Sequence, residues 1–298
     1  MSVTAKAIAD FIGLPLSKKA NVDISSVCTL GHLQSNCLTF LSIPTEARIA
    51  AIGARDDILV LVPEDTTISY PFLHIKCVNP RLFLSRVVAE FFYPSTLHEV
   101  SENSIIHPSA KIGNNVHIGH FTIIAENVVI GDDTYIGNNV EIFRNVKIGK
   151  HCHIKSQGVI GQQGFGFEKD EFQNYQRLPH IGSVILKDFI ELGVHSTIAA
   201  GTIYPTHIGS YTKIDDHAHI GHNCQIGENN IIAGGVVVSG SITTKNHVWF
   251  GPNSSMMQGL TFNEGSIIGV GAVMYTNAKA DTSYSARPAL PVMKPRDN

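Results

Sequence analysis

An aliphatic side chain returns at every sixth position through most of this chain. The first run of these positions holds only isoleucine: Ile106, Ile112, Ile118, Ile124, Ile130, Ile136, Ile142, Ile148, Ile154 and Ile160. The period returns at Leu186, slips by four residues near Pro205, and then continues to Met274. Six residues fit neither an α-helix nor an alternating strand, but they fit a prism in which three short strands make one coil. The sequence therefore predicts a mainly β protein, a left-handed parallel β-helix with hexapeptide repeats.

Two parts of the chain depart from this period. The stretch GQQGFGFEKDEFQNYQRLPH is too long and irregular for a turn, so we expect it to project from the prism as a loop. Before the first repeat, the apolar run 58–62 predicts a buried strand, and Asn79 followed by Pro80 predicts the start of a helix. The expected organisation is a small α/β domain over 1–100, the prism over 101–274 with the loop at 162–180, and a tail over 275–298.

Composition excludes several classes of function. The formal net charge of −3 comes without a basic run, which argues against a nucleic-acid partner. No apolar run approaches the roughly 20 residues that span a bilayer, and the N-terminal residues do not resemble a signal peptide. We therefore expect a cytoplasmic protein without membrane insertion. The five cysteines form no CxxC pair, so neither a disulfide framework nor a zinc finger is indicated.

Three segments carry a resemblance to a known family. They are IDDHAHIGHNCQIGENNIIAGGVVVSGS, the upstream GFGF with IGSVIL, and NPRLFLSR. Together they resemble the UDP-3-O-acylglucosamine N-acyltransferases of lipid A synthesis. The resemblance implies that His222 is the general base, that Asp215 supports it, and that the backbone N–H of Gly240 stabilises an oxyanion. It also implies that Phe165, Gly166 and Phe167 lie near the substrate, and that the chain forms a homotrimer with active sites between neighbouring prisms.

The chemistry of N-acyl transfer agrees with these residue types. An ammonium group must lose a proton before it attacks a thioester, and imidazole has a pKa close to working pH. Direct attack needs no covalent intermediate, so a serine or cysteine nucleophile is not required. Glycine at position 240 lets a thioester approach the backbone closely. His217 and His219 lie in the same coil as His222 and serve either as packing residues or as substrate contacts.

Other residues differ from the family pattern. Residues 197–201 read TIAAG where the family has T-x-D-R-G, which removes both charges. The segment 40–46 lacks the Asn, Lys and Tyr of the family's uridine motif, and Leu260 replaces a histidine. The C-terminal tail is too short for the family's long helix that meets acyl carrier protein. These differences favour a related activity, transfer of acetyl from acetyl-CoA to a nucleotide-linked deoxy-amino sugar for surface polysaccharides.

In that hypothesis the acyl donor is acetyl-CoA and no metal is needed. Coenzyme A is expected to lie along a groove between subunits, near these residues: Gly240, Gly251, Ala272, Lys279 and Arg287. The alternative is the lipid A enzyme itself, with a hydroxyacyl-acyl carrier protein as donor. Two minor alternatives are a metal site of the gamma-carbonic-anhydrase type, made from His180, His217 and His222, and a non-catalytic scaffold.

Overall fold

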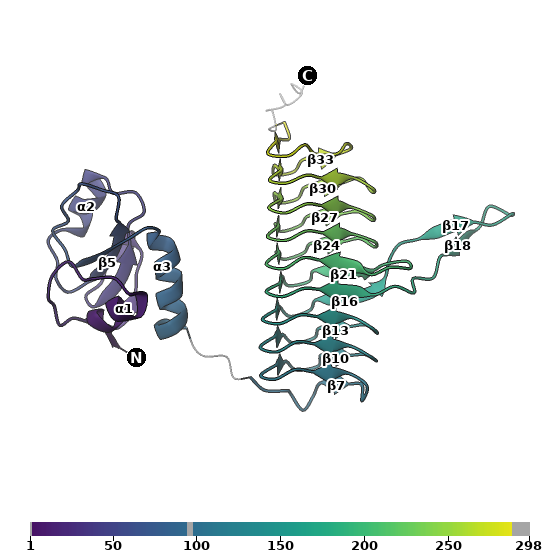
Figure 1. Ribbon diagram of the computed structural model, residues 1–298, viewed down its shortest axis with the longest axis horizontal. Helices are drawn as coiled ribbons and strands as arrows, with labels where there is room; N and C mark the ends of the chain where they lie inside the picture. The colour runs from purple at the N-terminus through teal and green to yellow at the C-terminus, as the bar shows by residue number, and fades with distance from the viewer. Residues whose placement is uncertain (1, 94–97, 288–298) are drawn as a thin grey trace, which may run out of the picture. The chain divides into compact units, whose positions relative to one another are not determined.

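The computed structural model describes residues 2–93 and 98–287 (Figure 1). Its chain divides into two compact units, Met1–Thr96 and Leu97–Asn298. The last part of the expected C-terminal tail, 288–298, lies outside the described residues. Among the described residues, no helix has the length and apolar character needed to cross a membrane.

The N-terminal unit is built around a parallel sheet in the order β3-β4-β5-β6. Its strands and the short β1–β2 pair have these bounds: β1 (Val3–Thr4), β2 (Asp23–Ile24), β3 (Ser26–Val27), β4 (Cys37–Phe40), β5 (Leu59–Pro63) and β6 (His74–Cys77). The helical segments are α1 (Ala5–Ile12), η1 (Leu30–His32), α2 (Glu46–Ile52), α3 (Pro80–Val87) and the π-helical turn η2 (Val88–Phe92). Strand β5 is buried throughout, as its apolar run predicts.

Helix α3 begins where the sequence places its start. The side chain of Asn79 accepts a hydrogen bond from the backbone N–H of Leu82 at 3.1 Å, and Pro80 occupies the first helical position. Asparagine stabilises a helix start by this bond, and proline gives up no hydrogen bond there. Helix α1 begins in the same way, because Thr4 accepts from the N–H of Ala7 at 3.1 Å.

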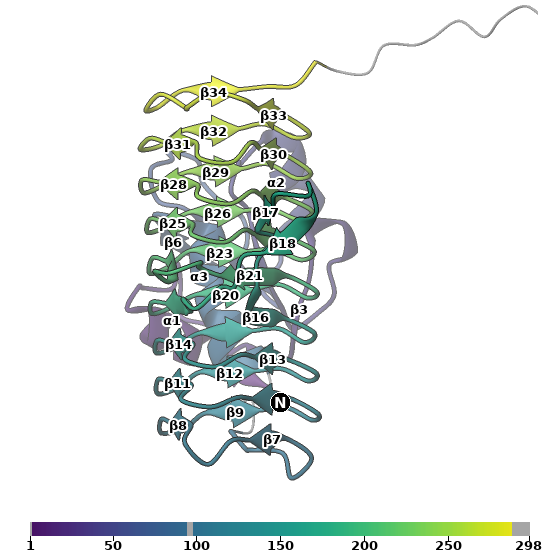
Figure 2. The same ribbon diagram turned by 90° about the vertical axis from the view of Figure 1, so that its right-hand side faces the viewer.

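The second unit is a stack of coils whose strands form three parallel sheets (Figures 1 and 2). Sheet 1 contains β7 (Ile105–Ile106), β10 (Ile123–Ile124), β13 (Glu141–Ile142), β16 (Val159–Gln163), β21 (Thr197–Ala200), β24 (His219–Ile220), β27 (Val237–Val238), β30 (Ser255–Met256) and β33 (Val273–Met274). Sheet 2 contains β8 (Lys111–Ile112), β11 (Val129–Ile130), β14 (Lys147–Ile148), β19 (Val184–Leu186), β22 (Thr206–Ile208), β25 (Gln225–Ile226), β28 (Thr243–Thr244) and β31 (Thr261–Phe262). Sheet 3 contains β9 (His117–Ile118), β12 (Tyr135–Ile136), β15 (His153–Ile154), β20 (Glu191–Leu192), β23 (Lys213–Ile214), β26 (Ile231–Ile232), β29 (Trp249–Phe250), β32 (Ile267–Ile268) and β34 (Ser283–Tyr284). The chain runs from sheet 1 to sheet 2 to sheet 3 in every coil, and the predicted left-handed parallel β-helix is confirmed.

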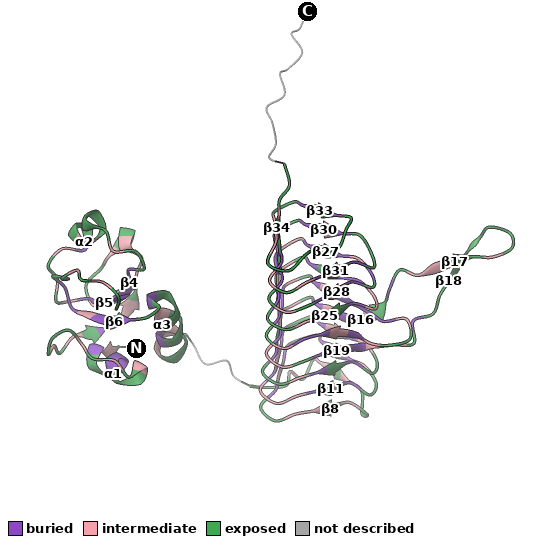
Figure 3. Ribbon diagram, turned by 45° about the horizontal axis from the view of Figure 1, so that its top comes forward, coloured by how far each residue is buried: buried purple, intermediate pink, exposed green. Residues whose placement is uncertain are grey.

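The repeat explains how these strands assemble. In most strands the residue with the six-residue period is buried, while its neighbour in the strand is more exposed (Figure 3). Ile198, Ile220 and Val238 illustrate this, because they pair in register on successive coils and are fully buried. Burial of such side chains, each contributing about 1.5–3 kcal/mol, stabilises the prism along its whole length.

At each corner of the prism, the backbone geometry restricts which residue types fit at two positions. The turn residue with a left-handed backbone is Asn or Asp more often than any other type, as at Asn115 with φ 55° and Asp133 with φ 57°. These side chains tolerate that conformation better than most. Glycine follows the buried residue where coils approach closely, since a methyl group on Gly131 would lie 2.7 Å from the carbonyl carbon of Gly149.

One long excursion interrupts the coils. After β16 the chain leaves the prism and forms an antiparallel hairpin of β17 (Phe167–Lys169) and β18 (Tyr175–Arg177) before returning at β19 (Figure 1). A shorter insertion over 201–205 precedes β22 and accounts for the four-residue slip near Pro205. Both leave from the corner between sheets 1 and 2.

Candidate active site

The corner between sheets 1 and 2 brings together several residues that are distant in sequence. His222 lies in the turn after β24, and Gly240 lies in the equivalent turn one coil later. The hairpin leaves this corner from the coil of β16, which is separated from β24 by β21 alone. Because equivalent turns stack along the prism, the base of the hairpin lies beside His222.

Glycines border the imidazole of His222 on two sides. A methyl group on Gly240 would lie 2.6 Å from Cε1 and 2.8 Å from Nε2 of that ring. A methyl group on Gly164 would lie 2.8 Å from the Cβ of His222. Atoms never approach so closely without displacement, so the ring occupies this space only because both positions lack a side chain.

The backbone N–H of Gly240 is available for a ligand. At other corners the N–H at the same place in the turn is bonded by a side chain eighteen residues later, as from Asn114 to Asp132 at 2.9 Å. Within the described residues, the N–H of Gly240 donates no hydrogen bond. A free N–H beside an imidazole is the arrangement that stabilises an oxyanion next to a general base.

Burial favours the neutral form of His222. It lowers the pKa of the imidazole below its ordinary value, and charge repulsion from His180 and His219 lowers that pKa further. A neutral imidazole near physiological pH can accept a proton. Within the described residues, the ring of His222 makes no hydrogen bond, so both of its nitrogens remain open to a ligand.

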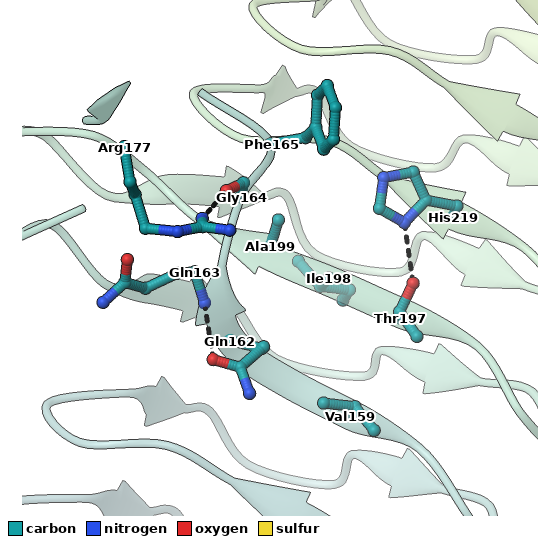
Figure 4. A pocket seen from close by; sticks show the side chains of 10 residues that line it. All are labelled: Val159, Gln162, Gln163, Gly164, Phe165, Arg177, Thr197, Ile198, Ala199 and His219. Atoms are coloured by element: carbon teal, nitrogen blue, oxygen red, sulfur yellow. Dashed lines mark hydrogen bonds between the residues drawn. The ribbon is translucent and has the colours of Figure 1, made fainter. Parts of the chain in front are cut away.

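A pocket of about 320 Å³ lies between the hairpin base and sheet 1 (Figure 4). Gly164 lines it and also contacts His222, which connects the pocket to the imidazole. Arg177 donates a hydrogen bond to the carbonyl of Gly164 at 3.3 Å and lies over the ring of Phe167 at 4.6 Å. The pocket thus has one cation at its edge.

The remaining walls of the pocket contain both polar and apolar side chains. His219 and Thr197 are joined by a hydrogen bond of 2.7 Å between Nδ1 and Oγ1 (Figure 4). Ala199 lines the same pocket, where the family pattern predicts a charged residue. Phe165 is 86% exposed and stands against Phe167 with ring centroids 4.9 Å apart. Phe165 lines the pocket and, with Phe167, offers an apolar surface beside it.

Other predicted residues lie at the corner on the other side of sheet 1. Asp215, His217, Gly251 and Ala272 all belong to the corner between sheets 3 and 1. Within the described residues of one chain, no hydrogen bond joins Asp215 to His222. His217 stacks on His195 with ring centroids 5.3 Å apart.

Within one chain, the remaining residues predicted to contact the donor do not lie near His222. The three histidines of the metal alternative do not lie together either. Lys279 and Arg287 are exposed near the end of the described chain. His217 is separated from His180 and His222 by sheet 1, so these three histidines do not form one cluster in a single chain. In the described part of the chain, no three side chains of His, Cys, Asp or Glu lie together in a way that could hold a metal ion.

Sequence reasoning did not assign a role in acyl transfer to His180. This residue follows the hairpin, is only 8% exposed, and meets the ring of His222 at 90° with centroids 5.2 Å apart. Its proximity depends on how the hairpin folds back to the corner, which the six-residue period does not describe. The one available signal was its place at the end of the irregular segment.

Comparison with known proteins assigns the family. The family model described as bacterial transferase hexapeptide (six repeats) matches residues 109–144 and 205–240. The UDP-3-O-acylglucosamine N-acyltransferase of Herminiimonas arsenicoxydans is 30% identical over 96% of this chain and 88% of its own length. The chain belongs to this family of hexapeptide-repeat acyltransferases.

Further relatives of this acyltransferase agree. The UDP-3-O-acylglucosamine N-acyltransferase of Dechloromonas aromatica is 36% identical over 80% of the chain and 73% of its own length. The solved structure of Francisella novicida UDP-N-acetylglucosamine acyltransferase has a TM-score of 0.58 at 25% identity, covering 63% of this chain and 67% of that one. The expected acyltransferase class is confirmed, whereas the donor and the sugar are not fixed by these matches.

Proposed function

We propose that this acyltransferase N-acylates a UDP-linked amino sugar of the UDP-3-O-acylglucosamine type, with His222 as general base. The observation that carries the proposal is the half-buried imidazole of His222 beside the free N–H of Gly240. The names of the relatives support this substrate better than the deoxy-amino sugar that the sequence differences favoured.

The proposed reaction needs only these groups and a thioester. Neutral His222 removes a proton from the sugar ammonium, and the freed amine attacks the thioester carbonyl carbon. A C–N bond forms, and the carbonyl oxygen gains a negative charge that the N–H of Gly240 stabilises. Collapse of this intermediate breaks the C–S bond and releases a thiolate. The proton held by the imidazolium, and the second proton of the amine nitrogen, pass to the thiolate and to water.

The pocket beside His222 is our proposed sugar-nucleotide site. Arg177 offers a positive charge to a diphosphate, since within the described residues it pairs with no carboxylate. His219 and Thr197 offer hydrogen bonds to sugar hydroxyls, and Phe165 with Phe167 offers an apolar surface to an acyl chain or a base. Gly166 lies at the hairpin base beside them. Arg177→Ala should therefore raise the KM of the sugar nucleotide more than it lowers kcat.

A homotrimer is part of the proposal. Asp215 and His222 flank sheet 1 at its two edges, so we propose that Asp215 orients the imidazole of a neighbouring copy and that the donor lies between copies. Gly251, Ala272, Lys279 and Arg287 remain proposed contacts of the donor's pantetheine and phosphates on that groove. Sedimentation of the purified chain tests the assembly, and a monomer at micromolar concentration contradicts it.

One observation favours a second candidate, acetyl transfer from acetyl-CoA to a nucleotide-linked deoxy-amino sugar. Ala199 occupies the pocket where the family pattern carries a charge, so this pocket suits a less polar sugar. The two candidates differ in donor as well as in sugar. Both use the same base and the same oxyanion contact.

Parallel assays by mass spectrometry separate the candidates. UDP-3-O-acylglucosamine with a hydroxyacyl-acyl carrier protein is one pair of substrates, and acetyl-CoA with a panel of nucleotide deoxy-amino sugars is the other. A product from the first pair supports the proposal, and a product from the second pair alone replaces it with the second candidate. His222→Ala should lower turnover by roughly 10²- to 10⁴-fold on either pair, and wild-type turnover in this variant contradicts the assignment of the base.

A further inference from the structure

His180 is a buried histidine with only one of its two ring nitrogens bonded. Its Nδ1 lies 2.9 Å from the carbonyl oxygen of Leu178, and that oxygen can only accept. Nδ1 therefore carries the proton, and Nε2 of the neutral ring is an acceptor. Nε2 is buried and has no hydrogen-bond partner in the described part of the chain.

The surroundings of His180 are shaped around this ring. A methyl group on Gly164 would lie 2.9 Å from its Nε2, and a methyl group on Gly166 would lie 2.9 Å from its Cε1. The same position on Gly164 faces the Cβ of His222 at 2.8 Å. The hairpin base thus has no side chain at the two places where one would push His180 away from His222.

The contact between the two imidazoles is edge to face. Their planes are at 90° and their centroids 5.2 Å apart, which is the arrangement that aromatic rings prefer when they attract each other. On its other side the ring of His222 meets the backbone of Gly240. Two rigid neighbours therefore limit how far this imidazole can rotate.

We propose that His180 is a positioning residue, which fixes the plane of the His222 imidazole for proton transfer. The inference rests on the proposed role of His222 as general base. His180 acts through His222, and it touches no reacting atom. Loss of its ring allows the base to rotate, which lowers kcat and leaves substrate binding largely intact.

Two substitutions separate this role from simple support of the hairpin. His180→Phe keeps a ring against His222 and removes the hydrogen bond to Leu178. His180→Asn keeps a donor for the carbonyl of Leu178 and removes the ring. The proposal predicts that His180→Asn lowers kcat by about tenfold with KM within about twofold, since small misplacement of a catalytic group is costly. It also predicts that His180→Phe loses less activity than His180→Asn.

A purely structural role predicts the reverse order. If His180 only ties the hairpin to the prism, His180→Asn keeps wild-type kcat and His180→Phe raises KM. That result overturns the proposal. His153→Phe is a matched control, because His153 stacks on Tyr135 on sheet 3, away from the hairpin.

The titration of His222 gives a readout that does not depend on activity. The charged and titratable groups near this imidazole are His180, His219 on β24 and Arg177, which reaches the carbonyl of Gly164. Loss of His180 removes one source of charge repulsion, so the pKa of His222 should rise in His180→Phe while burial is kept. NMR of histidine-labelled protein measures this shift. An unchanged pKa of His222 in His180→Phe would mean that His180 does not influence this imidazole, which contradicts the proposal.

Activity assays of His222→Ala keep the two hypotheses apart. If His222→Ala is inactive and His180→Asn turns over like wild type, the positioning role fails and the base assignment stands. If His222→Ala is fully active, the proposed base fails, and the effects of His180 variants then have another origin. Circular dichroism of each variant checks that the prism is folded.

Discussion

Gly240→Ala tests whether catalysis requires the present position of the His222 ring. The backbone of Gly240 has an ordinary φ, since it is not among the glycines with positive φ, so alanine fits there without backbone strain. Among the described residues, the three heavy atoms nearest to the added methyl group all belong to the imidazole of His222, whose Cε1 would lie 2.6 Å away. Ordinary carbon contacts begin near 3.4 Å, so the ring must retreat by about 0.8 Å.

The expected effect on rate follows from that displacement. Misplacing a catalytic group by about 1 Å costs roughly 10²-fold, so we expect kcat to fall by about 30- to 100-fold. Stability should change little, by less than about 1 kcal/mol, because a half-buried ring yields more easily than a packed core does.

Steady-state kinetics and thermal unfolding of Gly240→Ala measure both effects. Gly158→Ala is the matched control within the prism, since the nearest heavy atom to its added methyl group lies at 3.4 Å, an ordinary contact. This control should retain both rate and stability. Wild-type kcat in Gly240→Ala would refute the reasoning, because it would mean that proton transfer does not depend on where the His222 ring lies.

Three further predictions concern pH and packing. Burial lowers the pKa of His222 and the base must be neutral, so kcat/KM should rise with pH and reach half its plateau below pH of about 6.5; a midpoint above this value contradicts the role. Ile220→Ala empties a fully buried position and should cost about 2–5 kcal/mol in urea unfolding, whereas a loss below about 1 kcal/mol would show that neighbouring coils collapse into the space. Asp57 accepts two hydrogen bonds from Arg55, at 2.9 and 2.6 Å, which lowers the pKa of this carboxyl below its ordinary value. The stability from this pair is therefore present above pH of about 3.9 and lost as pH falls further. Because Asp57 is 42% exposed, Arg55→Ala should cost only about 0.2–1 kcal/mol at pH 7, and progressively less as the pH falls below about 3.9, measured by thermal unfolding.

The fold was predictable because its signal is local and repeated. Each inward residue is specified by its place in a six-residue unit, and no long-range pairing has to be guessed, since every strand pairs with the strand eighteen residues away in the regular coils. The same regularity predicts that His222 and Gly240, eighteen residues apart, lie in stacked turns. Their contact in the structure follows from this spacing.

The remainder of the candidate site follows from features that the period does not contain. Asp215 precedes His222 by seven residues. Strand β24 lies between them, so the two residues lie at opposite ends of this strand of sheet 1. A resemblance can transfer the role of such a residue, but it does not show which copy of the chain receives it. Sequence reasoning placed His180 beside His222 only in the metal alternative and gave it no role in acyl transfer, because its position depends on the return path of the hairpin, which follows no repeat.

The place of each histidine within the repeat separates packing from chemistry. His151, His195 and His217 occupy the left-handed turn position that Asn fills elsewhere, and their rings stack on neighbouring turns. His222 lies one residue before that position, as does His120, but Nδ1 of His120 is bonded to Ser101 at 2.6 Å. The turn position therefore explains the first three histidines through stacking. His222, in contrast, neither stacks along a column of turns nor forms a hydrogen bond within the described chain. It lies at the corner beside the hairpin base at Gly164, and such a side chain is the one that can exchange a proton with a substrate.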